Sequence, residues 1–153
     1  MKNIATLMTA DHRSCDNRLA AVEHAVSRKD WSSARAAFAD FQAAMLAHFA
    51  AEETVLFPQF EQRTGISQGP TQVMRNEHVQ MRQLLTAAGS ALANNDQDDY
   101  SGEVETLLIM MQQHNVKEEN VLYPMCDQHL ATEIEQLITA LLVQLDNPVK
   151  VTT

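Results

Sequence analysis

The chain has 153 residues, 45% of them hydrophobic, with only four glycines and four prolines, a composition that predicts a sizeable core built from long elements. Its formal net charge of −9 argues against a nucleic-acid partner, because phosphate binding needs clustered Lys and Arg. It has no apolar run near the roughly 20 residues that span a bilayer, no basic amphipathic stripe for a membrane surface and no signal-peptide core. We therefore expect a cytoplasmic protein that is mostly helical, since Ala, Leu, Gln, Glu and Met favour helices.

The first expected helix covers residues 3–28. Its apolar residues recur at steps of three and four, which is helical spacing, and His12 lies inside that pattern rather than in a loop. The second helix is expected over residues 33–57, and its apolar side also carries His48 and Glu52. These two helices therefore direct polar side chains toward the core.

A proline follows the second helix. Pro58 removes a backbone donor and crowds the preceding turn, so we expect the helix to kink or end there. Gly65 and Pro70 then bound the longest internal loop. The third helix is expected over residues 70–92, because proline suits a first helical position, and its inner face includes His78.

The stretch at residues 94–102 is polar, acidic and contains a glycine, so we expect a loop there. The fourth helix is expected over residues 101–123, with His114 and Glu118 facing inward and Pro124 closing it.

A fifth helix is expected at about residues 131–146, where apolar residues form one stripe without candidate metal ligands. We interpret it as a structural helix laid across the others, and residues 148–153 as a frayed tail. Cys15 and Cys126 are interpreted as buried thiols rather than a disulfide, because the expected compartment is reducing.

Two stretches of the chain are near copies of each other. Residues 48–58 read HFAAEETVLFP, and residues 114–124, which start 66 positions later, read HNVKEENVLYP. A histidine, two consecutive glutamates, valine, leucine and proline recur in both, and Phe57 stands where the second copy has Tyr123. A chance match of this density is improbable, which indicates an internal repeat.

The repeat extends to other histidines, since His12 corresponds to His78 at the same offset. We therefore expect a single domain over residues 1–153, built from two repeats at about residues 8–58 and 74–124 and completed by the C-terminal helix.

The spacing of the repeated residues predicts a metal site. Residues four apart in a helix lie about 40° apart on one face, so each repeated histidine points the same way as the glutamate four positions later. Their neighbours one turn away are apolar, which places the carboxylates in the core, where an unpaired charge is costly and a metal ion removes the cost. The candidate metal ligands are His12, His48, Glu52, His78, His114 and Glu118.

Other polar residues receive different interpretations. A lone histidine on an apolar face is more often a hydrogen-bonded residue than a ligand, and His24 and His129, which have no repeat partner, are interpreted as structural. Glu53 and Glu119 lie about 100° around the helix from the neighbouring glutamates. We expect them to support the ligands or to face solvent.

The donor set narrows the choice of metal. Imidazole and carboxylate donors without thiolate suit non-haem iron and, less specifically, manganese or zinc. Two carboxylates among four histidines suggest a pair of metals bridged by Glu52 and Glu118. Bundles of the ferritin type instead use four glutamates and Glu-x-x-His motifs.

The residues and motifs from His12 to Pro124 resemble those of hemerythrin-like, HHE cation-binding domain proteins. The resemblance implies an all-α fold, an up-down four-helix bundle of hemerythrin type, here with an additional C-terminal helix. It also implies two Fe ions bridged by carboxylates and an oxo or hydroxo group. In that scheme Glu52 and Glu118 bridge the metals, and the terminal ligands are His12, His48, His78 and His114.

The invertebrate oxygen carriers of the family differ from this chain in two respects. They place a further histidine one turn before the position of His78, where this chain has Met74. Their last carboxylate is an aspartate five residues after its histidine, whereas Glu118 follows His114 by four. The pattern is closer to the branch with iron-sensing and iron–sulfur-repair domains, and we expect an open metal position beside Met74.

Two classes of function stay open from the sequence. The first is a metal-binding module whose di-iron site binds or responds to O2, NO or related oxidants, or to iron supply. The alternative is an enzyme that reduces peroxide or NO, or a protein that supplies iron for iron–sulfur centre repair. A third hypothesis is a purely structural site for zinc or another metal. A small diatomic or oxidant ligand is the expected partner, and the sequence does not define the oligomeric state.

Overall fold

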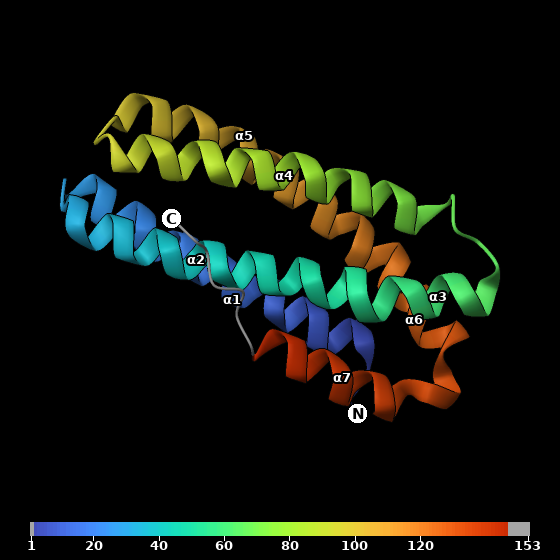
Figure 1. Cartoon of the computed structure of the whole chain (residues 1–153). Coiled ribbons are helices and arrows are strands. Elements are labelled where there is room, and N and C mark those ends of the chain that lie inside the picture. Colours follow the sequence, from blue (N-terminus) through green and yellow to red (C-terminus); the bar gives the residue numbers. More distant parts are fainter. Residues whose placement is uncertain (1, 147–153) are drawn as a thin grey trace.

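Four long helices lie side by side within residues 2–146, the part of the chain that the computed structural model describes (Figure 1). They are α1 (Ile4–Ser27), α2 (Trp31–Ala51), α4 (Pro70–Ala93) and α5 (Gln97–Lys117). No strand forms in this part of the chain, so the predicted all-α helical bundle is confirmed. The expected frayed tail, residues 148–153, lies outside the described residues.

Two matching turns join the long helices in pairs, α1 with α2 and α4 with α5 (Figure 1). Lys29 and Asn95, which are repeat counterparts, both adopt positive φ angles, of 56° and 53°. The aspartate after each of them, Asp30 or Asp96, caps the next helix by accepting a hydrogen bond from the backbone N–H three residues later. The repeat seen in the sequence therefore extends to the turn geometry.

The second of these caps corrects an expected boundary. The stretch at residues 94–102, expected as a loop, is mostly helical, because α5 begins at Gln97 directly after the Asp96 cap. Two acidic residues in the first turn favour that start through the helix dipole. Tyr100, in the stretch expected to be a loop, is fully buried in the core.

Each helix that carries a histidine with a glutamate four residues later continues past its proline. The expectation that Pro124 closes the fourth helix is therefore wrong, and Pro58, expected to kink or end the second helix, does not end it. α2 and α5 each run into a π-helical turn and then a further α-helix. The turns are η1 (Glu52–Leu56) and η2 (Glu118–Leu122), followed by α3 (Phe57–Thr64) and α6 (Tyr123–His129). In each turn a backbone N–H bonds to the glutamate carbonyl five residues earlier. The wider turn accommodates Pro58 or Pro124 at the start of the next helix, where a missing N–H costs little.

The expected C-terminal helix is present but begins later than predicted. A 3-10 turn, η3 (Ala131–Glu133), precedes α7 (Ile134–Leu145). α7 packs against α2, η1 and α1 (Figure 1) and buries Leu137, Ile138 and Leu141.

Two apolar clusters hold the helices together. One lies toward the α1–α2 and α4–α5 turns and includes Phe38, Phe41 and Tyr100. The other lies toward α3, α6 and α7 and includes Phe57 and Phe60. Each fully buried Phe or Leu side chain contributes about 1.5–3 kcal/mol, so both ends of the bundle are fixed around the polar layer that separates them.

The two cysteines belong to different clusters, Cys15 to the first and Cys126 to the second. Both are buried and free, as the sequence predicted. Burial raises the pKa of the Cys15 thiol to about 12 and also raises that of Cys126, so neither is a reactive thiolate.

Within residues 2–146, none of the helices combines the length and the apolar character needed to span a bilayer.

Candidate metal centre

The six candidate ligands meet in the polar layer between the two apolar clusters. Each exposes at most 5% of its surface, and each comes from a different element of the bundle: α1, α2, α4, α5 and the two π turns. Their ligand atoms form two groups, within which all atoms lie within 4.8 Å of one another. The first group is Glu52, His78, His114 and Glu118, and the second is His12, His48 and Glu118. The structure therefore brings together all six residues singled out in the sequence.

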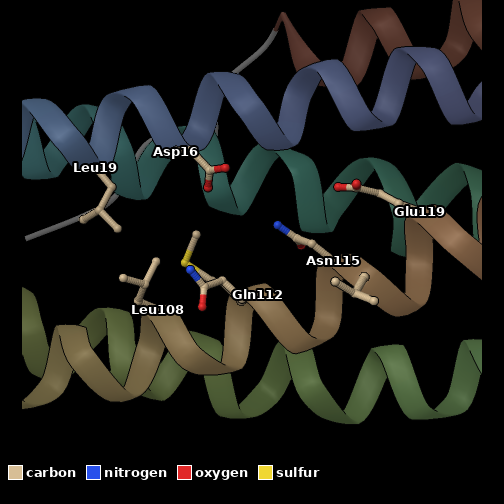
Figure 2. A pocket seen from close by; sticks show the side chains of 8 residues that line it. Asp16, Leu19, Leu108, Gln112, Asn115 and Glu119 are labelled. Atoms are coloured by element: carbon tan, nitrogen blue, oxygen red, sulfur yellow. The ribbon is translucent and has the colours of Figure 1, made fainter.

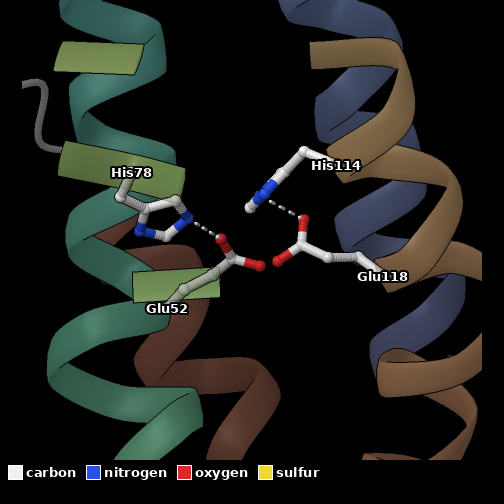
Figure 3. A group of neighbouring side chains, drawn as sticks. All are labelled: Glu52, His78, His114 and Glu118. Carbon is white, nitrogen blue, oxygen red and sulfur yellow. Dashed lines mark ion pairs between the residues drawn. The ribbon is translucent and has the colours of Figure 1, made fainter. Parts of the chain in front are cut away.

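The two carboxylates occupy the middle of the cluster and point toward each other (Figure 3). Oε1 of Glu52 lies 3.1 Å from Nε2 of His78 and 3.6 Å from Nε2 of His48. Oε1 of Glu118 lies 3.2 Å from Nε2 of His114 and 3.1 Å from Nε2 of His12. Each carboxylate thus faces one histidine of the first repeat and one of the second.

Every candidate histidine directs its other ring nitrogen, Nδ1, at a second carboxylate. These four acidic residues, called the outer carboxylates below, lie 2.7–2.8 Å from their histidines. The pairs are Glu119 with His12, Asp11 with His48, Glu53 with His78, and Glu77 with His114. Each Nδ1–H donates to its carboxylate, which fixes the ring so that Nε2 faces the centre.

The outer carboxylates follow the repeat. Glu53 and Glu119 are counterparts, and their supporting position agrees with the sequence interpretation. Asp11 and Glu77 are also counterparts at the 66-residue offset, but the sequence analysis missed them. Their signal was available: each is acidic, recurs in both repeats and directly precedes a candidate histidine.

Two outer carboxylates are themselves held by cations. Both oxygens of Glu53 accept hydrogen bonds of 2.8 Å from Arg82, and Glu77 pairs with Lys117. Burial alone would raise the pKa of Glu53, but hydrogen bonds from His78 and Arg82 lower it to about 2. The pKa of Glu77 is lowered by its bonds to Lys117 and His114, against the effect of burial. Both groups are therefore ionised and hold their histidines in one orientation.

Because each histidine donates through Nδ1 to an outer carboxylate, buried acceptor atoms face one another at the centre. Whether these acceptors suit a metal ion tests the proposed site. Since Nδ1 donates outward, each Nε2 presents a lone pair to the carboxylates. Four such buried atoms have no well-directed hydrogen bond: Nε2 of His78 and His114, Oε1 of Glu52 and Oε2 of Glu118. Buried acceptors of this kind need a shared cation. The nitrogen and oxygen donors fit a non-haem metal ion.

In the metal-free protein, protons take that role. Burial lowers the pKa of His48, but the charge of Glu52 and a hydrogen bond to Asp11 more than reverse this, and the pKa is raised well above its usual value. The pKa values of His78 and His114 are also raised, because contacts with Glu52 and Glu118 outweigh burial. A bound metal would replace these protons.

Tyr123 adds a polar atom that the sequence analysis did not assign. Its hydroxyl lies 2.7 Å from Glu52 Oε2 and 2.9 Å from Glu118 Oε1. It also lies 3.2 Å from Nε2 of both His12 and His48. Burial, with the charges of Glu118 and Glu52, raises the pKa of Tyr123 well above its usual value, so the phenol keeps its proton in the metal-free centre.

The remaining residues considered in the sequence lie outside the ligand groups. Met74 is buried in the apolar cluster that contains Phe57 and Leu122, and the expectation that it borders an open metal position stays a prediction. His24 and His129 are exposed and belong to neither ligand group.

Replacing Glu53 with glutamine is expected to weaken metal binding about 10–100-fold, because an outer partner orients its ligand and raises its basicity. The amide keeps the size of the side chain but loses the charge that holds His78 and Arg82. Glu61→Gln is the matched control, since Glu61 pairs with Arg75 at 3.1 Å and contacts no candidate ligand. Competition with a chelator measures both affinities, and equal losses in the two variants would contradict a role for Glu53 at the centre.

Comparison with known proteins gives one match. Residues 3–126 match the family model described as the hemerythrin HHE cation binding domain. Searches of curated proteins and of solved structures found no match. The matched range includes all six candidate ligands, the four outer carboxylates and Tyr123.

Proposed function

The chain belongs to the hemerythrin HHE cation-binding domain family, and on that premise we propose that it is a non-haem di-iron protein that binds O2, NO or a related small oxidant. The observation that carries this proposal is the buried pair of ligand groups, which contain four atoms without a hydrogen-bond partner. The four outer carboxylates add support, because they orient every histidine toward the centre.

The ligands would divide between two irons according to the repeat. His78 and His114 would hold one iron, and His12 and His48 would hold the other. Glu52 and Glu118 could serve both, because each lies between one histidine of the first pair and one of the second. Iron at these positions would supply a redox change and a coordination position for a small ligand.

A cleft between α1 and α5 supports access by a small molecule (Figure 2). It has a volume of about 380 Å³ and reaches Glu119, the outer carboxylate of His12. Its lining is Asp16, Leu19, Leu108, Met111, Gln112, Asn115, Val116 and Glu119. A diatomic molecule entering here would pass both apolar and polar side chains before it reached the layer that surrounds the ligands.

Metal analysis and absorption spectra of anaerobically prepared protein test the proposal. We expect two irons per chain and a spectral change on exposure to O2 or NO, which marks binding at the centre. His114→Ala should lose iron, whereas His24→Ala, which removes an exposed histidine on α1, should keep it. A wild-type chain that binds one iron, or only zinc, would refute the di-iron proposal. Sustained consumption of peroxide or NO would instead favour the alternative function, an enzyme that reduces these molecules.

A further inference from the structure

The two repeats differ at the position of Tyr123, whose hydroxyl lies among the candidate ligands. Tyr123, the first residue of α6, follows the second π turn, and Phe57, the first residue of α3, follows the other. Both side chains are fully buried. Because Phe57 has no hydroxyl, the His78 and His114 half of the centre lacks a phenol from the equivalent position. The halves of a duplicated site are therefore chemically different.

The Tyr123 hydroxyl cannot satisfy its surroundings as a hydrogen-bonding group. Four ligand atoms lie within 3.2 Å of it, two carboxylate oxygens and the Nε2 atoms of His12 and His48. Metal binding requires neutral histidines. When each neutral histidine donates through Nδ1, all four neighbours of the hydroxyl are acceptors, yet a hydroxyl has a single proton to donate. A cation at this point would be shared by the phenol oxygen and the atoms around it.

We propose that the phenol oxygen of Tyr123 is a ligand of the iron held by His12 and His48. The proposal rests on the di-iron function and adds a seventh protein ligand to it. As the oxygen–iron bond forms, the O–H bond breaks and its proton leaves to solvent. No electron is transferred in this step.

The added ligand makes the two irons unequal. An anionic phenolate oxygen is a hard donor that favours ferric iron, and it fills one position on the iron beside His12 and His48. Beside His78 and His114 the equivalent position is Phe57, which offers no such donor. The side chains around His78 are aromatic. The Phe49 ring stacks on His78 with 4.2 Å between ring centres, and Phe57 lies nearby. External small ligands therefore bind at the His78–His114 iron.

Visible absorption and resonance Raman spectra of the ferric protein test this ligand. We expect a phenolate-to-iron charge-transfer band, with tyrosine ring vibrations enhanced by excitation into it. Tyr123→Phe should lose both signals. The chain has only two tyrosines, so Tyr100→Phe is the matched control. Its hydroxyl bonds Glu23 at 3.0 Å in the other end of the core, and this variant should keep the band.

Iron content measured on every sample separates the two proposals. A wild-type chain without two irons contradicts the di-iron function and the tyrosine ligand together. A wild-type chain with two irons but no band, or a band that persists in Tyr123→Phe, overturns only the tyrosine ligand. If Tyr123→Phe does not fold, ring-deuterated tyrosine in the wild-type protein decides the matter, because the enhanced vibrations must then shift.

Discussion

Glu118→Ala is expected to abolish binding of both irons. Glu118 is the residue that the two ligand groups share, and its Oε1 lies 3.1 Å from Nε2 of His12 and 3.2 Å from Nε2 of His114. Removing it takes one donor from each metal and leaves two histidines without the carboxylate between them. The loss should exceed the about 10–100-fold that removal of an outer partner costs.

Iron content and affinity, measured after loading under anaerobic conditions, check this expectation. His48→Ala should weaken one iron more than the other, because His48 belongs to one ligand group only. Glu105→Ala, which removes an exposed glutamate from the same helix as His114, should bind iron as the wild type does. A Glu118→Ala protein that keeps one tightly bound iron would contradict the shared role of this carboxylate.

Removing the metal is expected to lower the melting temperature by roughly 5–10 °C. A ligand at 100 times its Kd stabilises the native state by about 2.7 kcal/mol, and each kcal/mol shifts the melting temperature of a chain of this size by about 2–4 °C. The physical reason is that buried carboxylates and imidazoles must find protons or water when no metal is present. An identical melting curve after verified metal removal would contradict it.

The difference between loaded and metal-free protein should widen as the pH rises from about 6 to 8. In the metal-free protein His48, His78 and His114 have raised pKa values. Their contribution to stability is complete below the pKa of the unfolded chain and is lost as the pH rises through the folded pKa. Metal binding displaces the same protons, so it strengthens over this range. Melting curves at several pH values, with and without iron, measure the difference, and a constant difference would show that these histidines do not hold the displaced protons.

The sequence alone determined the helical class, the repeat and the six candidate ligands. His48 and Glu52 are four residues apart on one helix, and helical periodicity directs both to the same side without reference to any other element. The 66-residue repeat then indicated that His114 and Glu118 do the same. The match over residues 3–126 confirms the family that these motifs suggested.

Element boundaries near the centre were less accessible from the sequence. A proline normally interrupts a helix. The sequence around Pro58 does not predict the π turn that accommodates this proline and lets the chain continue as α3. Similarly, the polar composition of residues 94–102 predicted a loop, although Asp96 caps a helix there and Tyr100 is buried. In the first place a π turn accommodates the proline, and in the second a helix cap outweighs the polar composition.

Only the tertiary structure decided how side chains meet across helices. Asp11 is next to His12 in the chain, yet it supports His48 on α2, and Tyr123 reaches His12 and His48, which lie 111 and 75 residues away. Spacing along one helix fixes the direction of a side chain relative to its own axis. The partner that it meets depends on how neighbouring helices are rotated and offset, which is set by packing throughout the core.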